Sequence, residues 1–434
     1  MDARLKLDGA AVLGALSELP GGRELLELSR ERGDVELVGG AARDLLLGRS
    51  PRELDVLVTG DVASLARELA TRLRGDRAGA AGAGPETTLH ERFGTATVAW
   101  ASGRIDIAAR RSEFYPAPGA LPEVRAGTAE EDLARRDFTI NAIAIPLSGP
   151  DRGVLRTVPN ALEDLRESRL RVLHERSFID DPTRLLRLAR YRARLGFELE
   201  QRTAELAVQA LAQGALTTVS GARLGAELRL ALTEPDPVAA LSELDRIGAL
   251  QALNPLLSID PALARVALAE TPPDAGTDVV LLACLILPIA RDGGADSKPV
   301  IRDLLDALEF GSGERQRALS AASDAAGLLT SLDGAERPSE LMGVLSDAPV
   351  EAIVLAVALG ELQSRTRATA AARRWLHELR HVRLKIGGDD LLAAGVPAGP
   401  EIGRRLDAAL AMRLDGELDD TPKAQLHAAL EGSP

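Results

Sequence analysis

Two carboxylates separated by one residue, Glu53 and Asp55, are the clearest candidates for chemistry in this 434-residue chain. Leu54–Val58 is an apolar run that predicts a β-strand, and residues two apart on a strand project from the same face. Paired carboxylates can hold Mg²⁺, and two such ions about 3.5–4 Å apart stabilise the attacking and leaving oxygens of an in-line phosphoryl displacement. The alternative is a solvated polar face on an edge strand.

A pair of glycines lies just before this strand. Residues 35–38 predict a strand that runs into Gly39 and Gly40. A short helix is expected next, with Arg43 in its first turn and Gly48 at its end. Glycines at a helix start let a phosphate approach the backbone N–H groups, and a guanidinium adds a charge-assisted contact. The spacing matches neither the dinucleotide fingerprint nor the Walker loop, and an ordinary glycine turn is the alternative.

This region resembles the head domain of the class II tRNA nucleotidyltransferase and bacterial poly(A) polymerase family. The residues that match the family spacing are Gly39, Gly40, Arg43, Asp44, Leu46, Leu47, Gly48 and Asp55. The family has a D-x-D pair at the carboxylates, so Glu53 stands where its first Asp is usual. Glutamate also ligates metals, but its extra methylene displaces the carboxylate by about 1–1.5 Å, a shift to which metal sites are sensitive.

A third carboxylate, Asp106, lies in the predicted strand Arg104–Ile107, which a turn at Ala101–Gly103 joins to the predicted strand Thr95–Trp100. If this strand neighbours the one that holds the carboxylate pair, Asp106 joins the same site. Otherwise it is an ordinary residue on a strand face. The stretch Glu113–Pro122, which ends in PGALP, resembles the same head domain.

The segment Asp132–Ala142 resembles the family's RRDFTINA motif almost letter for letter. Arg136 supplies a guanidinium for triphosphate oxygens, and Asp137 supplies an acceptor for ribose hydroxyls. The resemblance implies that this motif binds the ribose and phosphates of an incoming nucleotide. A surface ion pair, worth about 0–1 kcal/mol, is the alternative. Thr139–Ile145 also predicts a strand.

Farther along, Asp181 and Arg184 are placed to act together on a predicted helix. Asp181 fits the N-cap and Pro182 the first turn. At about 100° per residue, Asp181 and Arg184 share one face, and Arg187 and Arg190 lie within about 60° of each other. The resemblance to the family's E/D-D-x-x-R motif implies that Asp181 and Arg184 hydrogen-bond the incoming base, while Arg187 and Arg190 hold the nucleotide. A capped helix with a solvated basic face is the alternative.

The composition restricts the fold and the location. The net charge is −13, 45% of the residues are hydrophobic and 2% are aromatic, so the core must be aliphatic and mostly helical. The lone Cys284 excludes a disulfide framework and suits a reducing compartment. Val279–Ala290 is about half the roughly 20 residues of a membrane span and contains Pro288, so it predicts a buried helix. The segment from Ala10 does not fit a signal peptide, and we expect a cytoplasmic protein without a membrane partner.

The expected fold is α+β, with a small mixed-sheet nucleotidyltransferase head followed by an all-helical neck, body and tail. We expect the head at residues 1–150, a neck with the base-reading motif at 151–255, and an RNA-binding body and tail at 256–434. Turn-rich linkers are expected at Glu270–Gly276, Asp292–Pro299 and Asp333–Pro338. Val158–Leu165 lacks the glycine pair usual in relatives. Basic residues between Arg373 and Lys385 could meet RNA phosphates, with a solvated helix face as the alternative.

The resemblance implies a tRNA nucleotidyltransferase that adds CMP and AMP, the CCA end, to the 3′ end of tRNA from CTP and ATP. In this hypothesis Glu53 and Asp55 hold two Mg²⁺ ions, Asp106 completes the catalytic set, and pyrophosphate is released. No obligate protein partner is evident. Addition of only A or only C, and poly(A) synthesis, stay open. So do a non-catalytic RNA-binding relative and, with less support because no His-Asp ligand cluster is present, a metal-dependent phosphohydrolase.

Overall fold

The computed structural model describes residues 8–75, 84–90, 94–294 and 297–431, and the chain divides into two compact units. The first unit is Met1–Val219 and the second is Ser220–Pro434. The boundary therefore falls inside the segment 151–255 that was expected to form one neck, and the expected head boundary near residue 150 lies within the first unit. Each unit is described separately below.

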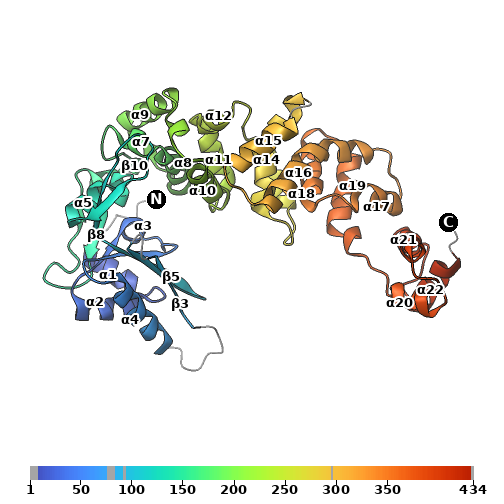
Figure 1. The fold of residues 1–434 in the computed structure, drawn as a ribbon, viewed down its shortest axis with the longest axis horizontal. Coiled ribbons are helices and arrows are strands. Elements are labelled where there is room, and N and C mark those ends of the chain that lie inside the picture. Colours follow the sequence, from blue (N-terminus) through green and yellow to red (C-terminus); the bar gives the residue numbers. More distant parts are fainter. Residues whose placement is uncertain (1–7, 76–83, 91–93, 295–296, 432–434) are drawn as a thin grey trace. The chain divides into compact units, whose positions relative to one another are not determined.

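The first unit contains helices and a mixed sheet (Figure 1). Its helices are α1 (Gly9–Ser17), α2 (Gly22–Arg32), α3 (Gly39–Leu46), α4 (Val62–Gly75), α5 (Ala129–Ala134), α6 (Ala161–Arg166), α7 (Ser177–Asp180), α8 (Thr183–Leu195) and α9 (Gln201–Ala212), with 3₁₀ helices η2 (Thr139–Asn141) and η3 (Ala215–Thr218). Helix α3 packs against strands β1, β2 and β8, and α4 packs against β3, β4 and β5. The helices thus bury the apolar residues of the sheet.

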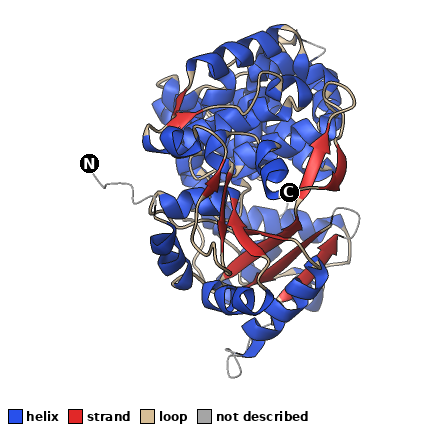
Figure 2. Ribbon diagram, turned by 90° about the vertical axis from the view of Figure 1, so that its left-hand side faces the viewer, coloured by secondary structure: helices blue, strands red, loops and turns tan. Residues whose placement is uncertain are grey.

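Seven strands of the described residues form one sheet, in the order β3-β4-β5-β2-β1-β8-β9. Figure 2 draws the strands of the protein in red and its helices in blue. Their bounds are β1 (Val35–Val38), β2 (Leu54–Val58), β3 (Glu86–His90), β4 (Thr95–Trp100), β5 (Gly103–Ala109), β8 (Ile143–Pro146) and β9 (Arg156–Thr157). Two small pairs stand apart, β6 (Arg111–Phe114) with β7 (Glu123–Ala126) and β10 (Arg169–Leu170) with β11 (Glu198–Leu199). In the main sheet β2 and β5 pair in parallel, and the other described pairs are antiparallel.

Most of the strands predicted from the sequence are confirmed. Those at 35–38, 54–58 and 95–100 have the predicted bounds, and the strand predicted at 104–107 extends over 103–109. The strand predicted at Thr139–Ile145 is wrong in its first half, because η2 occupies Thr139–Asn141. Thr139 donates through Oγ1 to Asp164 at 2.7 Å and through its backbone N–H to the carbonyl of Arg171 at 2.9 Å. These tertiary hydrogen bonds override the β propensity of the run.

Two predicted backbone details also differ. Helix α3 begins at Gly39 itself, so Arg43 lies one turn into the helix and not in its first turn. Helix α8 begins at Thr183 with Pro182 as its N-cap residue, one position later than predicted. Asp181 still accepts a hydrogen bond from the backbone N–H of Thr183 at 3.2 Å, so its capping contact remains. Where the relatives' glycine pair is missing, Asn160 adopts φ of 66°, a conformation that Asn tolerates.

The segment that contains α8 is tied to the predicted head by specific contacts. The backbone N–H of Gly119, in the PGALP stretch, donates to the carbonyl of Ile179 at 3.2 Å. Gly119 has φ of 68°, and a Cβ there would lie 2.1 Å from Thr218 Oγ1. The stretch therefore fits closely against the end of the first unit, which explains why residues 151–219 belong to the same unit as the sheet.

The second unit is helical throughout its described residues. Its elements are α10 (Gly221–Leu232), α11 (Pro237–Arg246), α12 (Ala249–Leu253), α13 (Pro261–Glu270), α14 (Thr277–Asp292), α15 (Ser297–Ala307), α16 (Ser312–Ser331), α17 (Pro338–Leu345), α18 (Val350–Leu362), α19 (Thr366–His377), η5 (Leu379–His381), α20 (Gly388–Ala393), α21 (Pro400–Leu414) and α22 (Pro422–Glu431). Helix α18 is apolar on all sides and packs against α13, α14, α16 and α19. It is the centre of this unit's core.

The apolar run Val279–Ala290 forms a buried helix as predicted, within α14, and burial raises the pKa of the Cys284 thiol to about 12. The linkers predicted at 270–276 and 333–338 lie between helices, whereas Asp292–Pro299 contributes to the ends of α14 and α15, and residues 295–296 lie outside the described residues. No single described helix meets the length and composition of a membrane span, although α17 and α18 meet them as a pair bent by 116°.

Candidate active site

Three carboxylates meet at the parallel strand pair. Asp55 on β2 and Asp106 on β5 are direct partners in the register, and Glu53 precedes β2 by one residue. Each of the three offers one oxygen within 4.8 Å of the others. The structure thus brings together the three acidic residues singled out from the sequence. Oxygen ligands at this spacing suit a hard divalent cation such as Mg²⁺.

The electrostatics of Asp55 favour a cation at this place. Burial raises the pKa of Asp55 to about 7, and the nearby Glu53 carboxylate adds to the rise. The guanidinium of Arg136 acts in the opposite direction, and the Asp106 carboxylate again raises the pKa. Three adjacent carboxylates repel one another, and a divalent cation between them relieves this repulsion. The donor set therefore fits a metal.

Asp106 has protein partners of its own. Thr97 Oγ1 donates to Asp106 Oδ1 at 2.6 Å, and Arg104 Nε lies 3.0 Å from Oδ1 and 2.9 Å from Oδ2. Arg104 Nε also lies 3.8 Å from Glu53 Oε2. The hydrogen bond to Asp106 raises the pKa of Arg104 above its ordinary value. Nothing in the sequence motifs singled out Arg104, although its i, i+2 spacing from Asp106 on a strand is a signal that could have found it.

The glycine turn lies against this triad. A Cβ on Gly39 would be 2.7 Å from Arg136 Nη1 and 3.8 Å from Asp55 Oδ2. A Cβ on Gly40 would be 3.6 Å from Arg43 Nη2 and 3.9 Å from Asp55 Oδ2. Gly39 has φ of 65°, which L side chains rarely adopt. Glycine at these positions leaves room beside Asp55 and Arg136 at the start of α3, and the first N–H groups of a helix have no partner within the helix.

The Arg43 guanidinium is enclosed by protein and is 1% exposed. Its Nη2 pairs with Asp44 Oδ1 at 2.7 Å, and its Nη1 donates to Asn141 Oδ1 at 2.5 Å. It also lies 5.4 Å from the centre of the Tyr191 ring. The structure therefore places Arg43 where it supports α3, with its donors engaged by other side chains.

The two arginines of the RRD motif share one buried carboxylate. Arg135 Nη2 lies 2.8 Å from Asp132 Oδ1, and Arg136 Nη2 lies 2.9 Å from Asp132 Oδ2. Burial alone would raise the pKa of Asp132, but the positive charges of Arg136 and Arg135 lower it below its ordinary value. Arg136 Nε is buried without a hydrogen-bond partner among the described residues. Arg136 is thus fixed beside Gly39 with donor capacity to spare.

Asp137 is buried and fully hydrogen-bonded. Its Oδ1 accepts from the backbone N–H of Phe138 and from Asn141 Nδ2, both at 2.8 Å. Its Oδ2 accepts from Arg187 Nε at 2.9 Å and Nη2 at 2.7 Å. Burial would raise the pKa of Asp137, but the Arg187 charge and the Asn141 hydrogen bond bring it down to about 2. A carboxylate has about four acceptor positions, so in this arrangement a ribose hydroxyl would have to displace Arg187.

Tyr191 on α8 contacts several arginines and one aromatic ring of the first unit. Its hydroxyl accepts from Arg187 Nη2 at 3.1 Å. The guanidinium carbons of Arg43, Arg187 and Arg194 lie 5.4, 5.6 and 5.3 Å from its ring centre, and Phe138 packs on the ring edge-on at 5.7 Å. Helix α8 is thereby joined to α3 and η2. Sequence reasoning missed Tyr191, and its i, i+4 spacing from Arg187 was the available signal.

The predicted base-reading residues lie at the start of α8. Asp181 Oδ1 accepts from Thr183 Oγ1 at 2.6 Å. Arg184 is 3% exposed, and its Nη2 donates to the carbonyl of Arg135 at 2.8 Å. Its Nη1 is buried and has no hydrogen-bond partner in the part of the chain that the structure describes. Arg190 is buried as well. A donor without a partner in a buried place marks a site where a ligand acceptor would be stabilised.

A pocket of about 540 Å³ includes Arg184 in its wall. Its lining residues are Ser112, Glu113, Phe114, Tyr115, Glu131, Ala134, Arg135, His174, Arg176, Asp180 and Arg184. Phe114 at this pocket is 62% exposed, and burial lowers the pKa of His174, which is therefore neutral at pH 7. The acidic Glu113 is engaged by Arg135 at 2.9 Å. The pocket thus has an exposed aromatic ring and the side chain of Arg184 in its wall.

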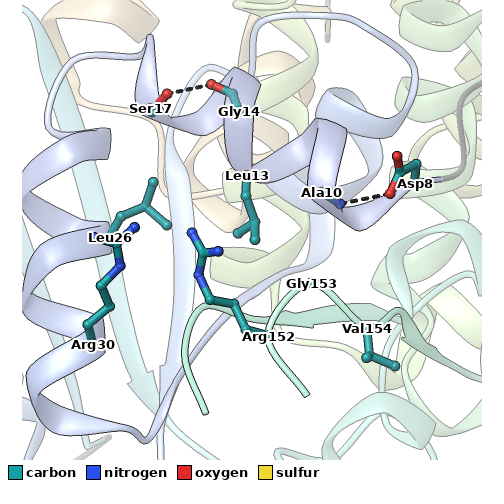
Figure 3. A pocket seen from close by; sticks show the side chains of 10 residues that line it. All are labelled: Asp8, Ala10, Leu13, Gly14, Ser17, Leu26, Arg30, Arg152, Gly153 and Val154. Carbon is teal, nitrogen blue, oxygen red and sulfur yellow. Dashed lines mark hydrogen bonds between the residues drawn. The ribbon is translucent and has the colours of Figure 1, made fainter. Parts of the chain in front are cut away.

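Another pocket, of about 460 Å³, is lined by residues of α1, α2 and the loop that contains Arg152 (Figure 3). Its lining includes apolar Leu13 and Leu26 beside the guanidiniums of Arg30 and Arg152. None of the residues predicted to carry chemistry lines this pocket. It is therefore distinct from the carboxylate site.

In the second unit, the basic residues predicted to meet RNA are mostly paired. Arg373 lies 2.8 Å from Glu270, and Arg380 makes two contacts with Asp274, at 2.6 and 2.8 Å. These ion pairs join α19 and η5 to the end of α13 and the loop after it. The pairing reduces the charge that this segment offers to a phosphate.

Comparison with known proteins identifies two family domains in the chain. Residues 35–171 match the "Poly A polymerase head domain", which contains the triad, the glycine turn and the RRD motif. Residues 196–260 match the "Probable RNA and SrmB- binding site of polymerase A". The CC-adding tRNA nucleotidyltransferase of Deinococcus radiodurans is 33% identical over 417 residues, which cover 94% of each chain. The chain belongs to the tRNA nucleotidyltransferase family.

Other members of the tRNA nucleotidyltransferase family differ in length. The A-adding enzyme of Geobacter sulfurreducens is 32% identical over 429 residues, which cover 91% of this chain and 45% of that protein. This chain spans 50% and 23% of two further A-adding relatives. The relatives are enzymes, and their names divide between addition of A, of CC and of CCA.

Solved structures of the family confirm the predicted mixed-sheet head and a mostly helical remainder. The prediction of an all-helical neck at 151–255 is wrong, because the short strands β9, β10 and β11 lie in that segment. An apo CCA-adding enzyme has a TM-score of 0.76 and 27% identity, covering 98% of both chains. A Thermotoga maritima CCA-adding enzyme complexed with tRNA has a TM-score of 0.72 and 26% identity, again covering 98% of both chains. CCA-adding enzymes in complex with CTP and with ATP have TM-scores of 0.72 and 0.74, identities of 26% and 27%, and cover 98% of this chain and 99% of theirs.

Proposed function

We propose that the protein is a tRNA nucleotidyltransferase that adds CMP, AMP or both to the 3′ end of tRNA from CTP and ATP and releases pyrophosphate. The observation that carries this proposal is the meeting of Glu53, Asp55 and Asp106 beside the open start of α3. Membership of the family supports it, as do the tRNA, CTP and ATP complexes of similar enzymes. With tRNA as substrate, the cytoplasm is the compartment that we propose.

Glu53 and Asp55 would hold Mg²⁺, with Asp106 at the same cluster. When bound there, Mg²⁺ would lower the pKa of the RNA 3′-hydroxyl and stabilise the charge on the departing pyrophosphate. The N–H groups at Gly39 and Gly40 would receive the triphosphate, because helix N-termini favour anions. Arg136 would add its unused donor to the phosphates.

Other residues would act by positioning. Arg43 would stabilise α3 and would not bind the nucleotide, because its donors are occupied by Asp44 and Asn141. Asp137 would fix Arg187, and through it the ribose and phosphate side of the nucleotide. Catalysis by positioning and electrostatics is the general pattern of phosphoryl transfer.

Arg184 and Asp181 would read the base. The buried Nη1 of Arg184 has no acceptor among the described residues, and a buried donor without a partner costs about 1–3 kcal/mol. A ring acceptor such as cytosine N3 or O2 would satisfy it, and the Asp181 carboxylate would accept from an exocyclic amine. Cytosine carries such an amine at C4 and adenine at C6, whereas uracil and guanine carry a carbonyl at that position and would leave a buried group unpaired there. The two residues thus suit C and A without separating them.

The choice among A, C and CCA addition is open to a direct experiment. The full chain is incubated with Mg²⁺, a single labelled nucleotide and tRNAs that end at the discriminator base, at C or at CC. Incorporation of A on the CC-ending tRNA only indicates an A-adding enzyme, whereas stepwise CCA indicates the complete activity. Runs of A beyond one residue indicate a poly(A) polymerase.

A matched pair of variants tests the site. Asp55→Ala should abolish incorporation, while Asp303→Ala, an exposed carboxylate on α15, should leave it unchanged. If the chain binds tRNA but extends none of the three ends, the proposal is wrong and a non-catalytic RNA-binding relative is favoured. Release of inorganic phosphate from small phosphoesters without extension would instead favour a phosphohydrolase.

A further inference from the structure

A guanidinium stands on the carboxylate triad itself. Arg104 and Asp106 are two residues apart on β5 and so lie on the same face of the sheet. Leu54 pairs with Ile105 in the register, which brings the residue before Leu54, Glu53, next to Arg104. The Arg104 side chain is 52% exposed, and its Nε contacts Asp106 at 2.9 Å and approaches Glu53 to 3.8 Å.

The three carboxylates of the triad differ in how many protein partners they have. Asp106 is held on both oxygens, by Thr97 and Arg104. Among the contacts of the described residues, none joins a side-chain donor to Asp55, and Arg104 approaches Glu53 only to the longer distance of 3.8 Å. The oxygens most available to a cation therefore belong to Glu53 and Asp55, while the third carboxylate is already matched with a tethered positive charge.

We propose that Arg104 is a positioning residue that anchors Asp106 and acts as a built-in counter-cation, so that it weakens the binding of a bare divalent cation at the triad. This inference rests on the triad that the proposed function uses as its metal site. A guanidinium and a divalent cation compete for the same carboxylate oxygens, and like charges at this distance repel. The longer side chain of Glu53, where relatives have Asp, contributes because it reaches toward Arg104.

Two further cations near the triad do not have this role. Arg136 is fixed by Asp132 and Arg43 by Asp44, so each has a carboxylate partner outside the triad. Arg104 instead takes both of its acidic contacts from within the triad. Removing its charge should therefore change the affinity of the triad directly.

The test measures Mn²⁺ binding to the full chain by electron paramagnetic resonance and calorimetry, without nucleotide or tRNA. We expect Arg104→Met to bind Mn²⁺ on the order of fivefold to tenfold more tightly than the wild type. Arg104→Lys keeps the charge and should stay within about twofold of the wild type. Arg125→Met removes an arginine of β7 that is 75% exposed and serves as the matched control, with no expected change. Asp55→Asn in the Arg104→Met background should remove the gain.

Tighter Mn²⁺ binding by Arg104→Met cannot result from unfolding, because an unfolded variant would lose the site. Melting temperatures check that each variant is folded. Equal or weaker Mn²⁺ binding by Arg104→Met would overturn the proposal, as would the absence of binding by both proteins. The assay contains no RNA, so its outcome is separate from the proposed function. A chain that shows the Arg104 effect but extends no tRNA would uphold this inference and refute the activity.

Discussion

Asp55 and Asp106 lie directly opposite each other on the parallel strands β2 and β5, and their side chains share one face of the sheet. Like charges opposite each other on neighbouring strands are destabilising, and here burial adds to the effect. The protein thus keeps two mutually repelling carboxylates beside the glycines that begin α3. Such an arrangement lowers the stability of the metal-free protein, and the loss can be measured as a change in the free energy of unfolding.

We expect Asp55→Asn to make the metal-free protein more stable at pH 8. The pKa of Asp55 is about 7 in the folded protein, against about 3.9 in an unfolded chain. Between these values the folded state keeps a proton that the unfolded state has lost, so the wild type loses stability as the pH rises from about 4 to about 7. The Asn variant lacks this loss, and its advantage should grow over that window to on the order of 2–4 kcal/mol and then level off.

Urea unfolding in EDTA at pH 5 and pH 8 measures this difference. Asp303→Asn, which neutralises an exposed carboxylate on α15, is the control and should follow the wild type at both pH values. If Asp55→Asn gains nothing between pH 5 and pH 8, then Asp55 is ionised without cost and its environment differs from the one described.

The sequence predicted those strands that bury their side chains. Residues 35–38, 54–58, 95–100 and 104–107 are apolar or alternate, and the structure has strands there. Strands β3 and β7 were not predicted because most of their side chains are exposed and carry no hydrophobic periodicity. The 3₁₀ turn at Thr139 depends on a hydrogen bond to Asp164, twenty-five residues away, which no local pattern reveals.

The site was predictable where it rests on short-range spacing. Glu53 and Asp55 are two residues apart, the possible pairing of two predicted strands added Asp106, and the resemblance added the roles of Arg136 and Arg184. What the sequence did not show is which donors are already used. Arg43 is hydrogen-bonded to Asn141, which lies 98 positions away in the sequence. Arg187 is hydrogen-bonded to Asp137, which lies 50 positions away. Such pairings are decided by tertiary packing and not by the local motif.

Alanine at Gly39 and at Gly48 should separate backbone strain from nucleotide binding. Both glycines have φ near +65°, at 65° and 68°, so alanine should destabilise either by about 1–3 kcal/mol. A Cβ on Gly39 would meet Arg136 Nη1 at 2.7 Å, whereas a Cβ on Gly48 meets nothing within 4 Å. We therefore expect comparable falls in melting temperature, but a rise in nucleotide KM of about tenfold or more for Gly39→Ala alone. An equal effect of both variants on KM would show that Gly39 matters only through strain.

Tyr191 should matter through its ring more than through its hydroxyl. Tyr191→Phe loses one hydrogen bond from Arg187, worth about 0.5–1.5 kcal/mol, but keeps the ring that three guanidiniums approach. Tyr191→Leu also loses those cation–π contacts, each worth about 0.5–1 kcal/mol or more. We expect the Leu variant to raise KM for ATP and CTP by the same factor, because it loosens the connection between α3 and α8 without touching the base. Steady-state kinetics with both nucleotides, beside melting curves, measures this, and equal defects in Phe and Leu would assign the role to the hydroxyl.

The basic residues between Arg373 and Lys385 should contribute to RNA binding only where no carboxylate of the protein pairs with them. Arg380 is 12% exposed and pairs with Asp274, whereas Arg383 is exposed and donates hydrogen bonds to the carbonyls of Arg380 and Val382. We expect Arg383→Ala to lower tRNA affinity and to reduce the slope of log affinity against log salt by about one unit. Arg380→Ala should leave that slope unchanged and lower the melting temperature instead, because it breaks a contact between the loop after α13 and η5. Filter binding of tRNA across a salt series measures both slopes. A slope that Arg383→Ala leaves unchanged would place the RNA on another surface of the protein, and a slope reduced by Arg380→Ala would mean that its ion pair opens when RNA binds.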